Sequence, residues 1–409
     1  MRIAIIGAGA AGCFAAINIA RRLPASDITI YESGTKSLAK VAVTGGGRCN
    51  LTNSFNAIKS AEAAYPRGSR LMKRLLRVFS QHDTMRWFED EGVSLVTQDD
   101  ECVFPASQDA MEIVGTLRRL MRQHNVSVML QHRCESIRAD GDTYNISFAN
   151  GNEAVADIVI VTTGGSPKAS GLRMLEPLNL DIVPPVPSLF SLNIDDAELQ
   201  QLSGTVVKNV TAGLVSTKLR TGGPLLITHW GMSGPAILKL SAFAARLLHD
   251  NSYKTDIIIN WFGDMRENQV AAFLEATAAE HPQKMLQSVT PQPFNSRLWN
   301  YLLHACNVNG AMRWAELGKK SVNRMAATLT AHSFAVTGKC RSKEEFVTCG
   351  GVALTNVSPS TLEAREHPNL YFAGEVLDID AITGGFNLQA AWTTAYVVAK
   401  SISEKENKF

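Results

Sequence analysis

Residues 3 to 12 read Ile-Ala-Ile-Ile-Gly-Ala-Gly-Ala-Ala-Gly, an apolar run that ends in glycines at the spacing G-x-G-x-x-G. This pattern predicts a strand, a tight turn and a helix over residues 11–22 whose N-terminus faces a phosphate group. A second apolar run ends at Glu32, where a carboxylate can accept hydrogen bonds from ribose hydroxyls. Because strand, glycines, helix, strand and acid follow in this order, the stretch indicates a dinucleotide site rather than a turn without a ligand. The residues expected to touch the dinucleotide here are Gly7, Gly9, Ala10, Ala11, Gly12, Glu32 and Ser33.

The composition is that of a globular protein with more than one core. The chain has 409 residues, 45% of them hydrophobic and 19% charged, which suggests two or three domains. A formal net charge of +2 provides no overall attraction for nucleic acid or acidic membranes. The 7 cysteines are odd in number and contain no C-x-x-C pair, so we expect reduced thiols in a cytoplasm and no metal site. The apolar start of the chain runs into Arg21-Arg22 instead of a cleavage site, and we expect no membrane-spanning segment.

The far end of the chain supplies a second segment of the nucleotide-binding kind. Residues 369–375 read Asn-Leu-Tyr-Phe-Ala-Gly-Glu, an apolar strand that runs into a glycine and an acid, and a helix is expected over 388–401. A nicotinamide coenzyme usually needs only the first motif, whereas the longer FAD is commonly held by an N-terminal motif and a late strand-loop-helix. The pair of segments therefore predicts FAD. Its expected contacts at this end are Gly374, Glu375, Asp380, Gly384, Gly385, Phe386, Asn387, Leu388 and Gln389.

Two further segments fit the same cofactor. Residues 156–165 form an apolar strand that ends in a small-residue turn, although an ordinary strand and glycine turn would look alike. Residues 43–53 read Val-Thr-Gly-Gly-Gly-Arg-Cys-Asn-Leu-Thr-Asn, and such a backbone can wrap a ligand while its arginine neutralises a phosphate or a flavin anion. The expected contacts are Thr163, Gly164, Gly165, Gly45, Gly46, Gly47, Arg48, Cys49 and Asn50.

These motifs resemble the BaiN-like, or YhiN-type, family of FAD-dependent oxidoreductases over the whole chain. The resemblance also rests on Thr228-His-Trp-Gly-Met-Ser-Gly-Pro235 and Thr348-Cys-Gly-Gly-Val352. Thr44 and Ala381 depart from it, since serine and glycine are usual at these places. The resemblance implies a Rossmann-like three-layer α/β domain that binds FAD, with Cys134 lending backbone atoms to the adenine.

The same resemblance implies that a β-barrel-like domain interrupts the FAD domain and itself carries a helical insertion. The residues agree in part, because 205–218, 225–228 and 255–262 favour strands whereas 264–331 favours helices. The expected boundaries are 1–188 and 341–409 for the FAD-binding domain, 189–262 and 332–340 for the β-barrel-like domain, and 263–331 for the helical domain.

His229 is the candidate catalytic residue. It lies shortly before Ser233, an expected N-cap, and Pro235, an expected first-turn residue of a helix over 236–248. The histidine could donate a proton or anchor a substrate anion over the flavin, or it could simply cap a turn between domains. Cys49 is a weaker candidate as a redox partner of the flavin, because no resolving cysteine lies near it in the sequence.

The sequence leaves three functions open. The first is hydride transfer through FAD to or from a small organic substrate, by reduction of an activated double bond or by amine oxidation. The second is reduction of uracil in structured RNA, which the resemblance implies because similar proteins include enzymes proposed to reduce the uracil ring of RNA. Its local support is a basic helix face opposite Leu71, Leu75 and Val78, which could also be an ordinary solvated helix face. The third is a redox-sensing flavoprotein without catalytic turnover. No second G-x-G-x-x-G unit follows, so NAD(P)H is expected only as a transient reductant, and the oligomeric state stays open. The basic face comprises Arg67, Arg70, Lys73, Arg74 and Arg77.

Overall fold

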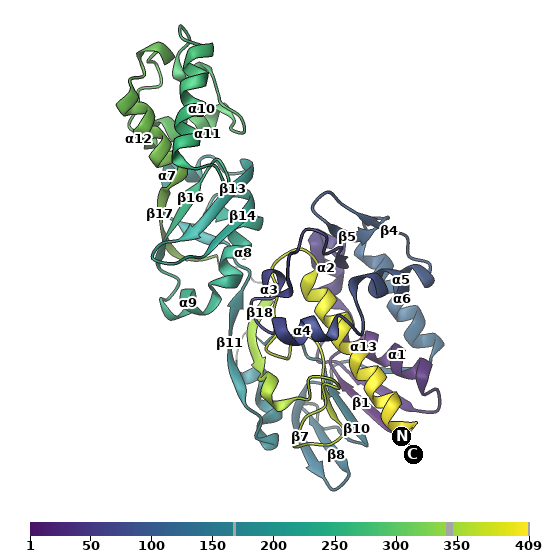
Figure 1. Ribbon diagram of the computed structural model, residues 1–409. Coiled ribbons are helices and arrows are strands. Elements are labelled where there is room, and N and C mark those ends of the chain that lie inside the picture. The colour runs from purple at the N-terminus through teal and green to yellow at the C-terminus, as the bar shows by residue number, and fades with distance from the viewer. Residues whose placement is uncertain (167–168, 341–346, 408–409) are drawn as a thin grey trace. The chain divides into compact units, whose positions relative to one another are not determined.

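The computed structural model describes residues 1–166, 169–340 and 347–407, which form two compact units (Figure 1). Unit 1 comprises Met1–Pro187 and Val347–Phe409, and unit 2 comprises Ser188–Phe346. The expected start of the second FAD-binding segment, residues 341–346, lies outside the described residues.

Unit 1 is built on a parallel sheet of five strands in the order β19-β10-β1-β2-β6. Its central strand β1 is paired on both sides, with Ile5 opposite Ile160 and Ile30. All four residues of β10 are buried, as in a parallel sheet covered on both faces. The predicted Rossmann-like fold is therefore confirmed. The strands are β1 (Arg2–Ile6), β2 (Asp27–Tyr31), β6 (Ser127–Met129), β10 (Ile158–Val161) and β19 (Leu370–Phe372).

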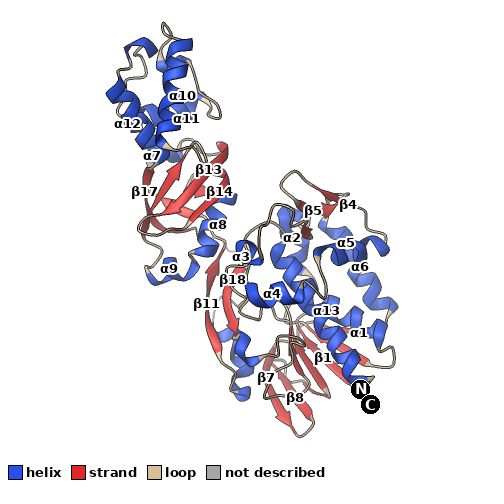
Figure 2. Cartoon of the chain, viewed as in Figure 1, coloured by secondary structure: helices blue, strands red, loops and turns tan. Residues whose placement is uncertain are grey.

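Helices and three smaller sheets, β3-β5-β4, β7-β8-β9 and β11-β18, complete unit 1 (Figure 2). Helix α1 packs along α13, so the beginning and the end of the chain lie together. Helix α13 starts two residues before the expected Leu388 and continues past Ser401, because buried side chains recur as far as Ser403. The helices are α1 (Ala10–Arg22), α2 (Ala39–Gly47), α3 (Ala61–Ala64), α4 (Ser69–Leu75), α5 (Gln81–Asp90), α6 (Ala110–Gln123) and α13 (Phe386–Glu406). The other strands are β3 (Thr52–Asn53), β4 (Leu95–Thr97), β5 (Cys102–Pro105), β7 (Cys134–Asp140), β8 (Thr143–Phe148), β9 (Glu153–Ala156), β11 (Ile182–Ser188) and β18 (Val347–Val352).

Unit 2 contains a closed barrel with the strand order β12-β15-β14-β13-β16-β17, and a helical insertion between β16 and β17. A single buried apolar cluster runs from the barrel into the insertion and includes Trp261, Trp299 and Trp314. The strands are β12 (Leu192–Ile194), β13 (Val206–Leu214), β14 (Arg220–Thr228), β15 (Gly231–Ser233), β16 (Thr255–Asn260) and β17 (His332–Lys339). The helices are α7 (Ala197–Gln200), α8 (Pro235–Phe243), α9 (Ala245–Asp250), α10 (Glu267–Glu280), α11 (Ser296–Ala305) and α12 (Lys319–Thr330).

Two local predictions in unit 2 are wrong. The expected helix over 236–248 is divided at Ala244, whose φ and ψ of −92° and 7° are not helical. The N-cap of α8 is Gly234 with φ +89°, whereas Ser233 ends strand β15 and accepts a hydrogen bond from the Ser191 hydroxyl. A Cβ at position 234 would lie 2.9 Å from Leu226 N, so only glycine allows this tight strand-to-helix turn. Pro235 occupies the first turn as predicted. Among the described residues, no helix combines the length and apolar character needed to cross a membrane.

Candidate functional site

The turn after β1 contains glycines of two different kinds. A Cβ on Gly7, at φ +112°, would lie 2.6 Å from Thr162 O, and a Cβ on Gly12 would lie 2.0 Å from Gly7 O. These two glycines are required by the packing of the fold. A Cβ on Gly9 would meet nothing within 4 Å, and Gly9 provides no side-chain cap for α1. The N-terminus of α1 therefore presents uncapped N–H groups beside open space, which suits a phosphate.

Glu32 lies at this turn, as predicted from its place after β2. Its Oε2 accepts from Ala8 N–H at 2.8 Å, and its Oε1 accepts from Gly34 N–H at 2.7 Å and from the Ser33 hydroxyl at 3.1 Å. The carboxylate thus connects the glycine turn to the end of the second strand. His132 N–H donates to Glu32 O at 2.8 Å, which brings the segment before Cys134 to the same edge of the sheet.

The glycine-rich segment 45–50 is a backbone cradle. Gly45, Gly46 and Gly47 have φ values of +59°, +70° and +84°, and a Cβ on either of the last two would meet nothing within 4 Å. Backbone N–H groups in turn conformations can form anion-binding concavities. Arg48 closes the cradle on itself: its Nε donates to Gly45 O at 3.1 Å, and its guanidinium lies 4.5 Å from the Phe104 ring centre.

Cys49 is enclosed beneath this cradle. It is fully buried and has φ +60°, and burial raises the pKa of its thiol to about 12. A thiol of this kind stays protonated at neutral pH, which argues against a redox role for it. The Cys134 thiol likewise has a pKa raised to about 12 by burial, and its Sγ lies 3.7 Å from Ser136 O.

The C-terminal glycines contact Asn50, at the end of the cradle, and strand β3, which follows it. Gly385, at φ +90°, is the N-cap of α13 and has no side-chain cap, and a Cβ there would lie 2.3 Å from Thr52 O. The Asn53 amide donates to Gly384 O at 3.0 Å. The loop before α13 is closed by Asn387, which bonds Ala381 N–H and Ala381 O at 2.9 and 3.0 Å. Segments more than 300 residues apart in sequence are thereby in contact.

The third segment reaches the same place. A Cβ on Gly165 would lie 2.4 Å from Oε1 of Glu375, and the same oxygen accepts from Thr348 N–H at 2.8 Å. Gly164 lies beside them at φ +75°, and Thr163 before it is exposed. A Cβ on Gly374 would lie 3.0 Å from Cβ of Ala11. All four predicted segments therefore meet within unit 1.

Three of the predicted residues turn their side chains into the protein. The Gln389 amide is fully buried, and its Oε1 accepts from the Thr52 hydroxyl at 2.5 Å. Phe386 is 2% exposed. The Asp380 carboxylate is fully buried and forms a bidentate ion pair with Arg67. Gln389, Phe386 and Asp380 thus position the loop, and only their backbones remain for a cofactor.

Sequence reasoning did not identify Thr162 and Arg67 as parts of this site. Thr162 Oγ1 donates to Gly7 O at 2.9 Å and so joins β10 to the first glycine turn. Its position directly before the predicted Thr163 was the available signal. For Arg67 there was none, because its partner lies 313 residues away.

His229 lies in unit 2, at the turn between β14 and β15. Its side chain is exposed and packs edge to face on Trp230, with ring centres 4.2 Å apart. The Thr228 hydroxyl oxygen and the Trp230 indole nitrogen are both buried, and neither has a hydrogen-bond partner among the described residues. The histidine is therefore flanked by two unsatisfied polar groups.

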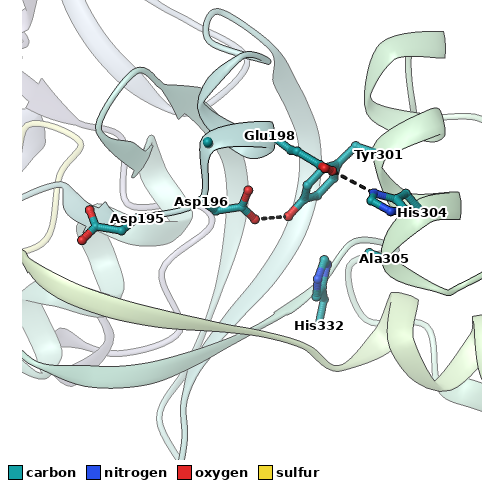
Figure 3. Close-up of a pocket in the computed structure, with 8 residues that line it drawn as sticks. Asp195, Asp196, Glu198, Tyr301, His304, Ala305 and His332 are labelled. Carbon is teal, nitrogen blue, oxygen red and sulfur yellow. Dashed lines mark hydrogen bonds and ion pairs between the residues drawn. The ribbon is translucent and has the colours of Figure 1, made fainter.

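A surface pocket in unit 2 is lined by residues of the barrel, of α7 and of the helical insertion (Figure 3). The Tyr301 hydroxyl donates to Asp196 Oδ2 at 2.6 Å, and His304 Nδ1 lies 2.8 Å from Glu198 Oε2. The Trp261 indole donates to His332 Nδ1 at 3.1 Å, and burial lowers the pKa of His332 to about 4. The described residues include no set of three or more His, Cys, Asp or Glu side chains placed to bind a metal ion. These bonds fasten α7 to α11 and indicate a structural junction.

Comparisons with known proteins agree with this geometry. The family model described as HI0933-like protein Rossmann domain matches residues 1–401. The 3-dehydro-bile acid delta(4,6)-reductase of Clostridium scindens is 26% identical over 412 residues, covering 99% of each chain. The ribosomal RNA dihydrouridine synthase of Escherichia coli is 27% identical over 410 residues, covering 97% of each chain. The solved 3-ketosteroid delta1-dehydrogenase of Sterolibacterium denitrificans shares the fold with a TM-score of 0.51 at 11% identity, covering 98% of this chain and 99% of that one.

Proposed function

Because the chain belongs to the HI0933-like family and is an FAD-dependent oxidoreductase, we propose that it reduces an activated carbon–carbon double bond in an organic substrate. The observation that supports FAD as cofactor is the meeting of both ends of the chain at one site: the uncapped N-termini of α1 and α13 and the cradle 45–47. A shorter nucleotide would need only the first of these.

Three groups of the site suit different parts of the cofactor. The N–H groups that open α1 suit the pyrophosphate, and Glu32 suits a ribose. The N–H groups that open α13 suit negative charge on the reduced ring. When bound, FAD supplies hydride transfer. The balanced overall reaction consumes NAD(P)H and one proton, adds two hydrogens across the double bond, and yields NAD(P)⁺.

His229 is proposed to contact the substrate. Thr228 and Trp230, which flank it, each hold a buried polar group without a described partner, and such groups are costly unless a ligand or water satisfies them. A substrate carbonyl or carboxylate oxygen would satisfy the indole N–H. We expect His229→Gln to lower kcat/KM for substrate by at least about tenfold while NAD(P)H still reduces the flavin at the wild-type rate.

Stopped-flow absorbance on the purified protein tests the assignment. Bleaching of the flavin band by NADH or NADPH, followed by reoxidation on addition of an unsaturated ketone, supports a reductase. Reduction by an amine alone would instead support an amine oxidase. Flavin that is reduced and reoxidised only by air, with no acceptor turned over, would support a redox sensor.

A second candidate function is reduction of uracil in structured RNA. It is favoured by the name of the Escherichia coli relative, which covers 97% of this chain. The test mixes the protein with its flavin reduced, in parallel reactions, with ribosomal RNA and with a free unsaturated ketone. Loss of the uracil ring absorbance with no turnover of the ketone would favour RNA over a small substrate.

A further inference from the structure

The surface around α4 carries a basic stripe that the flavin site does not use. Four exposed cationic side chains line one groove, and they are Arg70, Lys73, Arg74 and Arg77. Their spacing of three and four residues places them on one side, while Leu71, Met72 and Leu75 are buried on the other. The sequence prediction is wrong in two members. Arg67 turns inward to Asp380, and Val78, beyond the end of α4, is 38% exposed instead of apolar core.

The positive charge of the stripe is not neutralised by ion pairs between the described residues. Within the described ranges, none of its four side chains forms an ion pair with a carboxylate. Glu62, a carboxylate on α3, interacts electrostatically with two cations of the stripe. Its pKa is lowered, first by its own backbone N–H and the Ser60 hydroxyl, and further by the charges of Lys73 and Arg70. An anion placed on the stripe is therefore attracted by four cations and repelled by Glu62.

The stripe is attached directly to the loop that is proposed to hold the flavin. Arg67 and Asp380 form an isolated antiparallel bridge in addition to their ion pair. The next residue, Gly68, has φ +75°, and a Cβ there would lie 2.7 Å from Ile379. The Tyr65 hydroxyl donates to Phe386 O at 3.0 Å. The segment that precedes α4 thus contacts both the loop before α13 and the first residue of that helix.

We propose that the basic stripe binds the phosphodiester backbone of a folded RNA, beside the flavin-side loop. This inference rests on the second candidate function and names the surface that would hold such a substrate. The four cations lie along eight residues, from Arg70 in α4 to Arg77 just beyond its end, a length of about 10 Å at the rise of a helix. Measured along the axis of a duplex, that length matches about three phosphates of one strand, at about 3.4 Å of axis per charge. Among the described residues no aromatic side chain lines the groove, which fits contact with a phosphate backbone better than stacking on unpaired bases.

Salt-dependent binding of a labelled RNA hairpin tests the stripe. We expect the double variant Arg70→Glu/Arg74→Glu to weaken binding at least about tenfold and to make the slope of log K against log salt shallower by about 2. The control Lys319→Glu/Lys320→Glu makes the same charge change on exposed residues of α12 and should change affinity less than about twofold. Glu62→Gln should tighten binding, because it removes the opposing acid. FAD absorbance of each variant reports that the fold is intact.

The outcomes distinguish failure of RNA binding by the stripe from failure of the reductase assignment. Unchanged affinity and slope in Arg70→Glu/Arg74→Glu overturn the stripe, and so does an equal loss in the control. Binding of ADP as tight as that of the hairpin, and equally sensitive to these variants, also overturns it, because a small nucleotide would then be the ligand. Failure of NAD(P)H to reduce the flavin refutes the reductase assignment and leaves the binding result standing.

Discussion

The substitution Gly9→Ala tests where the cofactor lies. Gly9 has φ −85° and ψ −165°, which alanine adopts without strain, and an added Cβ meets no protein atom within 4 Å. The free energy of unfolding of the apoprotein should therefore change by less than about 1 kcal/mol. A pyrophosphate on the uncapped N–H groups of α1 would be displaced by the methyl group. Loss of two charge-assisted hydrogen bonds at about 1.5–3 kcal/mol each corresponds to at least about a hundredfold increase in the Kd for FAD.

The assay is a titration of apoprotein with FAD, followed by quenching of flavin fluorescence, together with urea unfolding of the same apoprotein. Gly115→Ala is the matched control, because Gly115 lies within α6 and its added Cβ also meets nothing within 4 Å. Gly12→Ala should lose both stability and FAD, since its Cβ would lie 2.0 Å from Gly7 O. If Gly9→Ala binds FAD within about threefold of the wild type, no pyrophosphate occupies this turn and the reasoning fails.

Three further predictions concern buried groups. Arg67→Gln removes the cation paired with the fully buried Asp380 carboxylate, and urea unfolding should show a loss of about 3–5 kcal/mol; a loss below about 1 kcal/mol would contradict the structural role of the pair. His332 has a pKa of about 4 in the folded protein and an ordinary value of 6.5, so between these pH values the unfolded chain binds more protons than the folded one. The free energy of unfolding therefore falls as pH is lowered from 6.5 to 4, by at most about 3 kcal/mol. Urea unfolding from pH 4 to 7 should show a smaller fall in His332→Gln than in the wild type, despite the opposing charge of Asp196. Cys49, with its pKa raised to about 12 by burial, should resist iodoacetamide at pH 8 until the protein unfolds, and rapid alkylation of the native protein in a peptide mass map would refute this.

The parallel sheet could be predicted from sequence because its signals are local. The glycine spacing, the apolar runs and the acid at Glu32 lie within one short segment, and each segment follows its own strand. The exact turn at the start of α8 could not be predicted in this way. Ser233 is a good N-cap by propensity, but strand pairing in the barrel keeps it in β15, and the N-cap is one residue later, at Gly234 with φ +89°.

Side-chain direction was the part of the site that sequence could not provide. Asp380 and Gln389 have the composition of ligand-binding residues, yet both are buried against partners that are distant in the sequence, Arg67 and Thr52. A buried carboxylate needs a cation and a buried amide needs hydrogen bonds, and only the folded chain brings these partners together. The same limit explains why Arg67 was assigned to the basic face: its helical spacing was right, but it precedes α4 and faces the loop.

The glycines fall into those that backbone packing requires and those that face open space. Gly7, Gly12 and Gly385 are forced by backbone atoms within 2.0 to 2.6 Å of an added Cβ, so they would be needed whether or not a ligand binds. Gly9 faces open space with an ordinary backbone, and Gly46 and Gly47 face open space in left-handed conformations. Since packing does not demand glycine at Gly9, close approach of a ligand is the remaining physical reason for it in this motif. The three open positions occur at the N-terminus of α1 and in the cradle, where an extended cofactor needs access to the backbone.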